Sequence, residues 1–187
     1  MKDPINYEIN KELGECYLFM GEYDKAKGYY EKAVTCDADC ADPFMGLAAI
    51  SLAIGNLEEA CAHYNRANDL GSNAKTLIGL GMVEMELGKH ENAFLHFEQA
   101  LSHDPLNMIA INSIVQLGYV LKTLDRVVPF LESAIMKDET LEAVRYTLAG
   151  CLASLGRENE AKAHLETILG ANPDNDQAQN LYACFSA

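Results

Sequence analysis

Basic residues are scarce in this sequence. Its 187 residues include 14 Lys and Arg against 28 Asp and Glu, so the formal net charge is −14 at pH 7. Nucleic acids and anionic membrane surfaces are bound through clustered Lys and Arg, so the scarcity argues against both kinds of partner. Hydrophobic residues make up 49% of the chain, which is enough apolar mass for it to fold.

Long hydrophobic runs are also lacking. No run approaches the roughly 18 apolar residues of a membrane-spanning helix, so we expect no membrane insertion. The segment from Met1 to Tyr7 is polar and contains no apolar core of a signal peptide. The expected location is therefore the cytoplasm, although a chain trimmed of its leader would look the same.

Catalytic motifs are missing as well. The sequence has no dinucleotide-binding glycine pattern, no phosphate-binding loop and no nucleophile elbow. His63, His96 and His164 recur at equivalent places in repeated segments, too far apart to share a metal, and no catalytic partner recurs with them. Glu84 and its neighbours are interpreted as charges on a solvated helix face. The sequence predicts a non-catalytic protein without cofactor or metal.

The six cysteines do not form a metal-binding pattern. Cys36 and Cys40 are the only close pair, and no second pair of Cys or His stands at ligand spacing. Most of the cysteines lie in apolar helical stretches, where we expect them to act as small buried hydrophobic residues.

What the sequence does contain is a repeat of about 34 residues. Gly21, Gly55 and Gly88 are spaced 34 and 33 apart, and two further steps of 34 lead through Lys122 to Gly156. Small residues and large apolar residues recur at fixed offsets after these positions, at the three- and four-residue spacing of one helical face. The small residues are Ala26, Ala60, Ala93, Val127 and Ala161, and the large ones are Tyr30, Tyr64, Phe97, Leu131 and Leu165.

This pattern predicts stacked helix pairs. Each unit is expected to be two antiparallel helices joined by a tight turn, where glycine takes the left-handed conformation that ends the first helix. No single unit can bury its own apolar face, so the units must stack. Asp3-Pro4 and Asp42-Pro43 are expected to supply an N-cap followed by proline, and Asn172-Pro173-Asp174 to open the last stretch similarly.

The repeat resembles the tetratricopeptide repeat family, most closely in the third unit with Gly81, Gly88, Phe97 and Pro105. The resemblance implies an all-α, right-handed superhelical solenoid of antiparallel helix pairs in a single domain over 1–187. The five repeats are expected at residues 7–40, 41–73, 74–107, 108–141 (degenerate) and 142–175, with a capping helix at 175–187.

The fourth repeat departs from the pattern. Lys122 replaces the turn glycine, and Pro129 falls inside the expected second helix, where proline removes a hydrogen bond. Either the helix is kinked there, or Asp125 is an N-cap that starts it late and leaves Pro129 in its first turn. A locally altered superhelix is expected in either case.

The resemblance implies a peptide-binding groove lined by the first helix of each pair. In the family subtype that grips carboxylates, Lys, Asn and Arg line this face. Only Lys11 is suitable here, and Glu15 stands beside it, so such a clamp is not expected. The apolar, Met- and Tyr-rich positions instead favour an apolar peptide or an amphipathic helix. The expected groove residues are Lys11, Glu15, Met45, Ala49, Leu52, Ile78, Met82, Met85, Asn112, Gln116, Tyr119 and Tyr146.

Three functions remain open on the sequence. The first is an adaptor or scaffold that binds a protein or peptide of unknown identity in this groove. The second is a scaffold that self-assembles into a homo-oligomer, and the third is a chaperone that shields an apolar segment of a secreted or assembled subunit. Met45, Met82 and Met85 also have an alternative interpretation as plain core between neighbouring helices.

Overall fold

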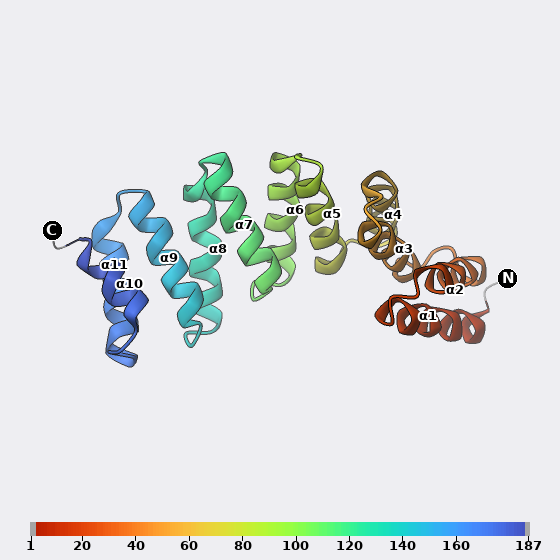
Figure 1. Cartoon of the computed structure of the whole chain (residues 1–187), viewed down its shortest axis with the longest axis horizontal. Helices are drawn as coiled ribbons and strands as arrows, with labels where there is room; N and C mark the ends of the chain where they lie inside the picture. The colour runs from red at the N-terminus through yellow and green to blue at the C-terminus, as the bar shows by residue number, and fades with distance from the viewer. Residues whose placement is uncertain (1–2, 186–187) are drawn as a thin grey trace. The chain divides into compact units, whose positions relative to one another are not determined.

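The computed structural model describes residues 3–185, and over this range the chain is helical without any strand (Figure 1). The predicted all-α fold is confirmed. Among the described helices, none combines the length and the apolar character required to cross a membrane. The chain divides into two compact units, unit 1 at Met1–His103 and unit 2 at Asp104–Ala187.

Unit 1 contains three helix pairs, and in each pair the two helices pack on one another. The first pair is α1 (Pro4–Phe19) and α2 (Tyr23–Cys36), the second is α3 (Asp42–Ala53) and α4 (Leu57–Leu70), and the third is α5 (Ala74–Glu86) and α6 (His90–His103).

Unit 2 contains two helix pairs and a final short helix. The pairs are α7 (Met108–Leu121) with α8 (Leu124–Lys137) and α9 (Glu142–Ser154) with α10 (Glu158–Ala171), followed by α11 (Asp176–Ala183). Helix α11 buries Ala178 and leaves its Gln and Asn side chains exposed, and its role as a cap stays a prediction. The expected end of that helix at residues 186–187 lies outside the described residues.

Of the three helix N-caps predicted from the sequence, one is confirmed. The side chain of Asp3 accepts a hydrogen bond from the backbone N–H of Asn6 at 3.2 Å. The prediction for Asp42 is wrong, because the Ala41 carbonyl already accepts the Met45 N–H and Ala41 is the N-cap.

The predicted start of the last helix is wrong too. Asn175 is the N-cap, and its side chain accepts the Ala178 N–H at 2.9 Å. Asn172 instead ends α10, and Pro173 and Asp174 lie in the turn between the two helices.

The turns within the pairs have the predicted left-handed backbone. In the four glycine turns φ lies between 71° and 79°. Lys122 takes the same conformation with φ of 57°, although a side chain disfavours it. The helix after Lys122 begins at Leu124, with Thr123 at the N-cap and Pro129 inside it. The alternative of a late start capped by Asp125 is therefore wrong.

Two core clusters of unit 1 combine residues from successive pairs. Ala26 and Tyr30 of α2 pack with Leu47 and Ile50 of α3. Glycine makes this approach possible, because a Cβ on Gly46 would overlap the ring of Tyr30. A second cluster joins Ala48, Ala60 and Tyr64 to Leu80 and Val83 of α5 in the same way.

Candidate functional site

Three first helices of unit 1 surround a surface hollow of about 360 Å³. We call it the unit 1 groove. Helix α1 contributes acidic and apolar side chains, α3 contributes the middle, and α5 contributes one lysine. Its walls are Glu15, Leu18, Asp42, Met45, Ala49 and Lys75, and its floor is Tyr30, Gly46 and Tyr64.

The floor of the groove is aromatic because the repeat places a tyrosine under each glycine. The Tyr30 ring lies against both Gly14 and Gly46, and Tyr64 lies against Gly79. Tyr30 is only 2% exposed, and this burial raises the pKa of its hydroxyl to about 12. Burial also raises the pKa of Tyr64. The floor is therefore uncharged at neutral pH.

The walls of the groove carry charges of both signs. Glu15 and Asp42 are exposed carboxylates on α1 and α3, and Lys75 is an exposed ammonium on α5. Lys11 is already paired, since its Nζ lies 2.6 Å from Glu8 Oε2, and this hydrogen bond raises the pKa of Lys11. The lysine that sequence reasoning considered for a carboxylate is thus bound to a neighbour.

The structure brings together three of the groove residues expected from the sequence, Glu15, Met45 and Ala49. Leu52 is half-buried and packs against the core cluster of the second and third pairs instead. Sequence reasoning missed Asp42 and Lys75. The signal was available for Asp42, since it stands one helical turn before Met45 on the same face.

The methionines are divided between groove and core. Met45 lines the groove but also packs on the core, where it accepts a hydrogen bond from Thr76 Oγ1 to its sulfur at 3.1 Å. Met82 is 40% exposed, Met85 is half-buried, and Ile78 is buried at 7% exposure. On α5, then, Ile78 belongs to the core.

The expected groove residues of unit 2 lie mostly on the surface of α7. Asn112, Gln116 and Tyr119 are exposed, and Tyr146 on α9 is half-buried. Tyr119 lines a second hollow of about 360 Å³, where its hydroxyl lies 3.4 Å from Ser154 Oγ. Partial burial raises the pKa of Tyr119.

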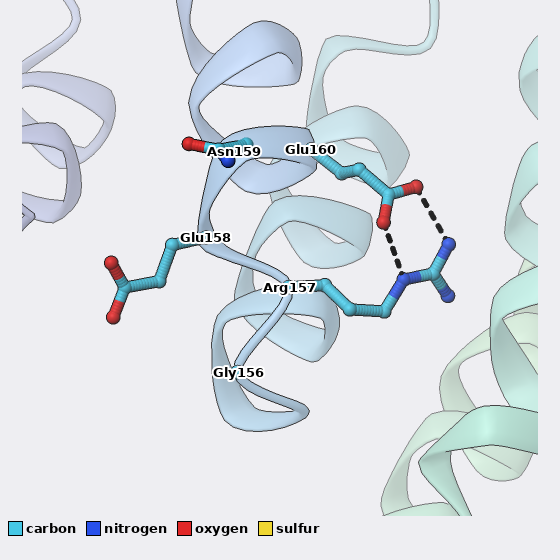
Figure 2. A pocket seen from close by; sticks show the side chains of 5 residues that line it. All are labelled: Gly156, Arg157, Glu158, Asn159 and Glu160. Atoms are coloured by element: carbon cyan, nitrogen blue, oxygen red, sulfur yellow. Dashed lines mark hydrogen bonds and ion pairs between the residues drawn. The ribbon is translucent and has the colours of Figure 1, made fainter.

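A further hollow at the start of α10 holds a closed ion pair (Figure 2). Arg157 Nε and Nη2 each donate to one oxygen of Glu160 at 2.7 Å. These bonds lower the pKa of Glu160. Because the two charges satisfy one another, this turn offers little to a ligand.

One polar pair in unit 1 differs from the sequence interpretation. Glu84 is buried at 7% exposure, not solvated, and its Oε2 lies 2.6 Å from His96 Nδ1. The hydrogen bond joins α5 to α6 and supplies a buried carboxylate with a partner. Across residues 3–185 no three His, Cys, Asp or Glu side chains are grouped so as to hold a metal ion.

The cysteines are less buried than predicted. Cys151 alone among them is buried, Cys16 and Cys184 are exposed, and the rest are half-buried. The prediction is wrong for the exposed two because Cys16 faces outward on α1 and Cys184 follows the last helix.

Family models match most of the chain. Three models described as tetratricopeptide repeat match residues 4–75, 74–105 and 122–183. A bovine protein, BBSome complex member BBS4, is 32% identical over 107 residues, which cover 57% of this chain and 20% of that protein. Human DnaJ homolog subfamily C member 7 is 26% identical over 91% of this chain and 37% of its own length. The chain thus spans well under half of these relatives.

Solved structures share the fold. A tetratricopeptide repeat protein from Parabacteroides merdae superposes with a TM-score of 0.71 at 18% identity, covering 97% of this chain and 74% of that one. YrrB, a tetratricopeptide repeat protein with an unusual peptide-binding site, superposes with a TM-score of 0.68 at 17% identity, covering 91% of this chain and 89% of that one. The first repeat domain of Spaghetti (RPAP3), solved with the HSP90 peptide SRMEEVD, gives 0.62 at 25% identity over 65% and 98%. This chain belongs to the tetratricopeptide repeat family.

Proposed function

We propose that the chain is a non-catalytic adaptor that binds an apolar peptide or an amphipathic helix in the unit 1 groove. The observation that carries the proposal is the hollow itself. Leu18, Met45 and Ala49 present apolar surface over a tyrosine floor. Such a surface suits an adaptable apolar contact.

The charges on the walls define the ligand further. Glu15 and Asp42 present negative charge to a ligand in the groove, and Lys75 presents positive charge at the α5 end. The preferred peptide therefore has apolar side chains with a basic residue toward α1. The SRMEEVD peptide of the Spaghetti structure is acidic at its end. In this chain Lys11, the lysine considered for such an end, is paired with Glu8.

The test fills the groove without touching the core. Ala49→Arg places a long side chain in the hollow, while Ala53→Arg makes the same change one turn later on α3, at an exposed position. Peptides are selected on the wild-type chain from a displayed random library and their affinity is measured by calorimetry. We expect Ala49→Arg to weaken binding about tenfold or more, and Ala53→Arg to leave it unchanged.

The melting temperatures of both variants serve as the folding control. Equal binding by wild type and Ala49→Arg, or a library from which no peptide is enriched, contradicts the proposal. Self-assembly through the same groove is the competing function. It predicts that wild type sediments as an oligomer and Ala49→Arg as a monomer.

A further inference from the structure

Three charged side chains around the unit 1 groove have no partner of their own. Glu15, Asp42 and Lys75 line the hollow and are exposed. Within residues 3–185 none of the three side chains forms a hydrogen bond or an ion pair. A ligand that pairs with them therefore breaks no existing ion pair, unlike a ligand at the closed pair of Arg157 and Glu160.

The three charges are ordered along the groove. Asp42 and Lys75 stand 33 residues apart, as Gly55 and Gly88 do, so they occupy the same place in successive repeats. Helix α3 contacts α1 and also α5. The α1 and α3 end of the groove is therefore acidic, through Glu15 and Asp42, and the α5 end is basic.

Lys11 shows the effect of the acidic end on a cation. Its pKa is raised chiefly by the hydrogen bond with Glu8, while desolvation opposes the rise and the charges of Glu8, Asp42 and Glu15 add to it. One ammonium group thus stands near three carboxylates. Two negative charges remain unbalanced, and a basic residue of a ligand would reduce this excess.

The size of the hollow limits the conformation of the ligand. At about 360 Å³ it is at the small end of ligand pockets, which hold about 300–1,000 Å³. An α-helix with its side chains is about 10–12 Å across, so it would lie over the hollow without filling it. An extended chain is narrower and brings its apolar side chains against Leu18, Met45 and Ala49.

The separation of the charges sets their spacing in the ligand. Packed helices lie about 8–10 Å apart, so we expect about this distance between Asp42 on α3 and Lys75 on α5. A polyproline II chain has three residues per turn and rises about 3.1 Å per residue, so residues three apart face one side at about 9 Å. In an α-helix the same reach takes about seven residues.

We infer that the unit 1 groove binds an extended peptide in which a basic and an acidic residue stand three positions apart with two apolar residues between them. The basic residue pairs with Glu15 and Asp42, and the acidic residue pairs with Lys75. The apolar residues contact Met45 and Ala49. The inference rests on the proposed function of this groove and excludes the helical ligand that the proposed function leaves open.

Three peptides test the inference on the full chain, with affinities measured by calorimetry at low salt. The Lys–Glu peptide has about eight residues, with Lys-Leu-Leu-Glu between prolines that keep it extended. The Lys–Lys peptide replaces its Glu by Lys. The helical peptide carries a leucine stripe with Lys and Glu seven positions apart. We expect the Lys–Glu peptide to bind about fivefold more tightly than either of the others, whereas general attraction to a chain of net charge −14 favours the Lys–Lys peptide.

Charge reversals with matched controls locate the two ends of the peptide. Asp42→Lys is expected to weaken the Lys–Glu peptide about fivefold. Lys75→Glu is expected to weaken it by about the same factor and to strengthen the Lys–Lys peptide. Asp69→Lys and Lys89→Glu make the same changes of charge at exposed positions outside the hollow, and we expect them to leave both affinities nearly unchanged.

Failure of the inference differs from failure of the proposed function. If library peptides bind and Ala49→Arg blocks them, but the Lys–Glu peptide binds no better than the Lys–Lys or the helical peptide, the inference is overturned and the proposed function stands. Equal losses in Asp42→Lys and Asp69→Lys overturn the inference in the same way. Absence of binding by every peptide, those of the library included, overturns both. An oligomer of the wild type that Ala49→Arg dissociates assigns the groove to a second copy and also overturns both.

Discussion

Lys122 adopts at its turn the left-handed backbone that glycine adopts in the other four turns of this kind. A residue with a Cβ loses about 1–2 kcal/mol in this conformation. Glycine avoids that loss, but it also loses more conformational entropy on folding, which offsets part of the gain. We expect Lys122→Gly to stabilise the chain by about 1 kcal/mol, raising the midpoint of thermal unfolding by about 2–4 °C.

The control for that substitution is Lys122→Ala, which keeps a Cβ in the same backbone conformation. Its unfolding midpoint is expected to match that of the wild type, because alanine is strained there as lysine is. A lower midpoint for Lys122→Gly than for Lys122→Ala would show that the lysine side chain stabilises this turn by another route.

Tyr30 makes the stability of unit 1 sensitive to alkali. Its pKa in the folded chain is about 12, against about 10 in an unfolded chain. The unfolded state therefore loses this proton first, so the stabilisation is complete below pH 10 and is lost as the pH rises toward 12. The difference amounts to about 3 kcal/mol, since each pKa unit corresponds to about 1.4 kcal/mol.

Tyr30→Phe removes the titrating hydroxyl and keeps the ring. Urea unfolding of both proteins is measured from pH 9 to 12. We expect the free energy of unfolding of the wild type to fall by about 2–3 kcal/mol more than that of Tyr30→Phe. Parallel pH profiles would mean that the hydroxyl of Tyr30 is already solvated in the folded chain.

At the scale of helices, Gly46 and Gly28 differ in whether their surroundings leave room for a side chain. A Cβ at Gly46 of α3 would overlap the Tyr30 ring, whereas a Cβ at Gly28 of α2 meets no atom within 4 Å. Gly46→Ala is expected to destabilise unit 1 by about 1–3 kcal/mol through overpacking. Gly28→Ala is expected to stabilise α2 by up to about 1 kcal/mol through helix propensity.

Circular dichroism during thermal unfolding measures both substitutions. The double variant Gly46→Ala with Tyr30→Leu should be less destabilised than the sum of its two single changes, since the overlap is removed. Additive effects would place the cost of Gly46→Ala somewhere other than the ring of Tyr30.

The sequence predicts the helices, but it does not predict which side chains are buried where burial depends on tertiary packing. The 34-residue period predicts the helix pairs and their left-handed turns, because both follow from local preferences of glycine and from helical spacing. The same period does not predict that Glu84 is buried, because the hydrogen-bond partner of Glu84 is His96, twelve residues away on the next helix. Ile78 and Met82 lie on the same side of α5, four residues apart, and likewise differ in exposure, at 7% and 40%.

At the scale of the whole molecule, the repeat predicts one domain over 1–187, and this stays a prediction. The structure groups its helices into unit 1 and unit 2, and each has its own buried residues. A uniform repeat carries no mark of such a division, because every pair has the same small and large positions. The groove residues expected from the sequence fall in both units, and Glu15, Met45 and Ala49 of unit 1 line one hollow.

Because the chain divides into two units, we expect a packing defect to destabilise its own unit more than the other. In repeat proteins each pair is stabilised mainly by its immediate neighbours, so a packing defect raises local opening near itself more than far away. Gly46→Ala in α3 is expected to speed amide hydrogen exchange in α1 to α4 and to leave α9 and α10 nearly unchanged. Leu148→Ala removes a fully buried side chain of α9, destabilising by about 2–5 kcal/mol, and should give the opposite pattern. Exchange measured by mass spectrometry on both variants decides the matter: acceleration of equal size in α1 to α4 and in α9 and α10 would show that the two units unfold as one.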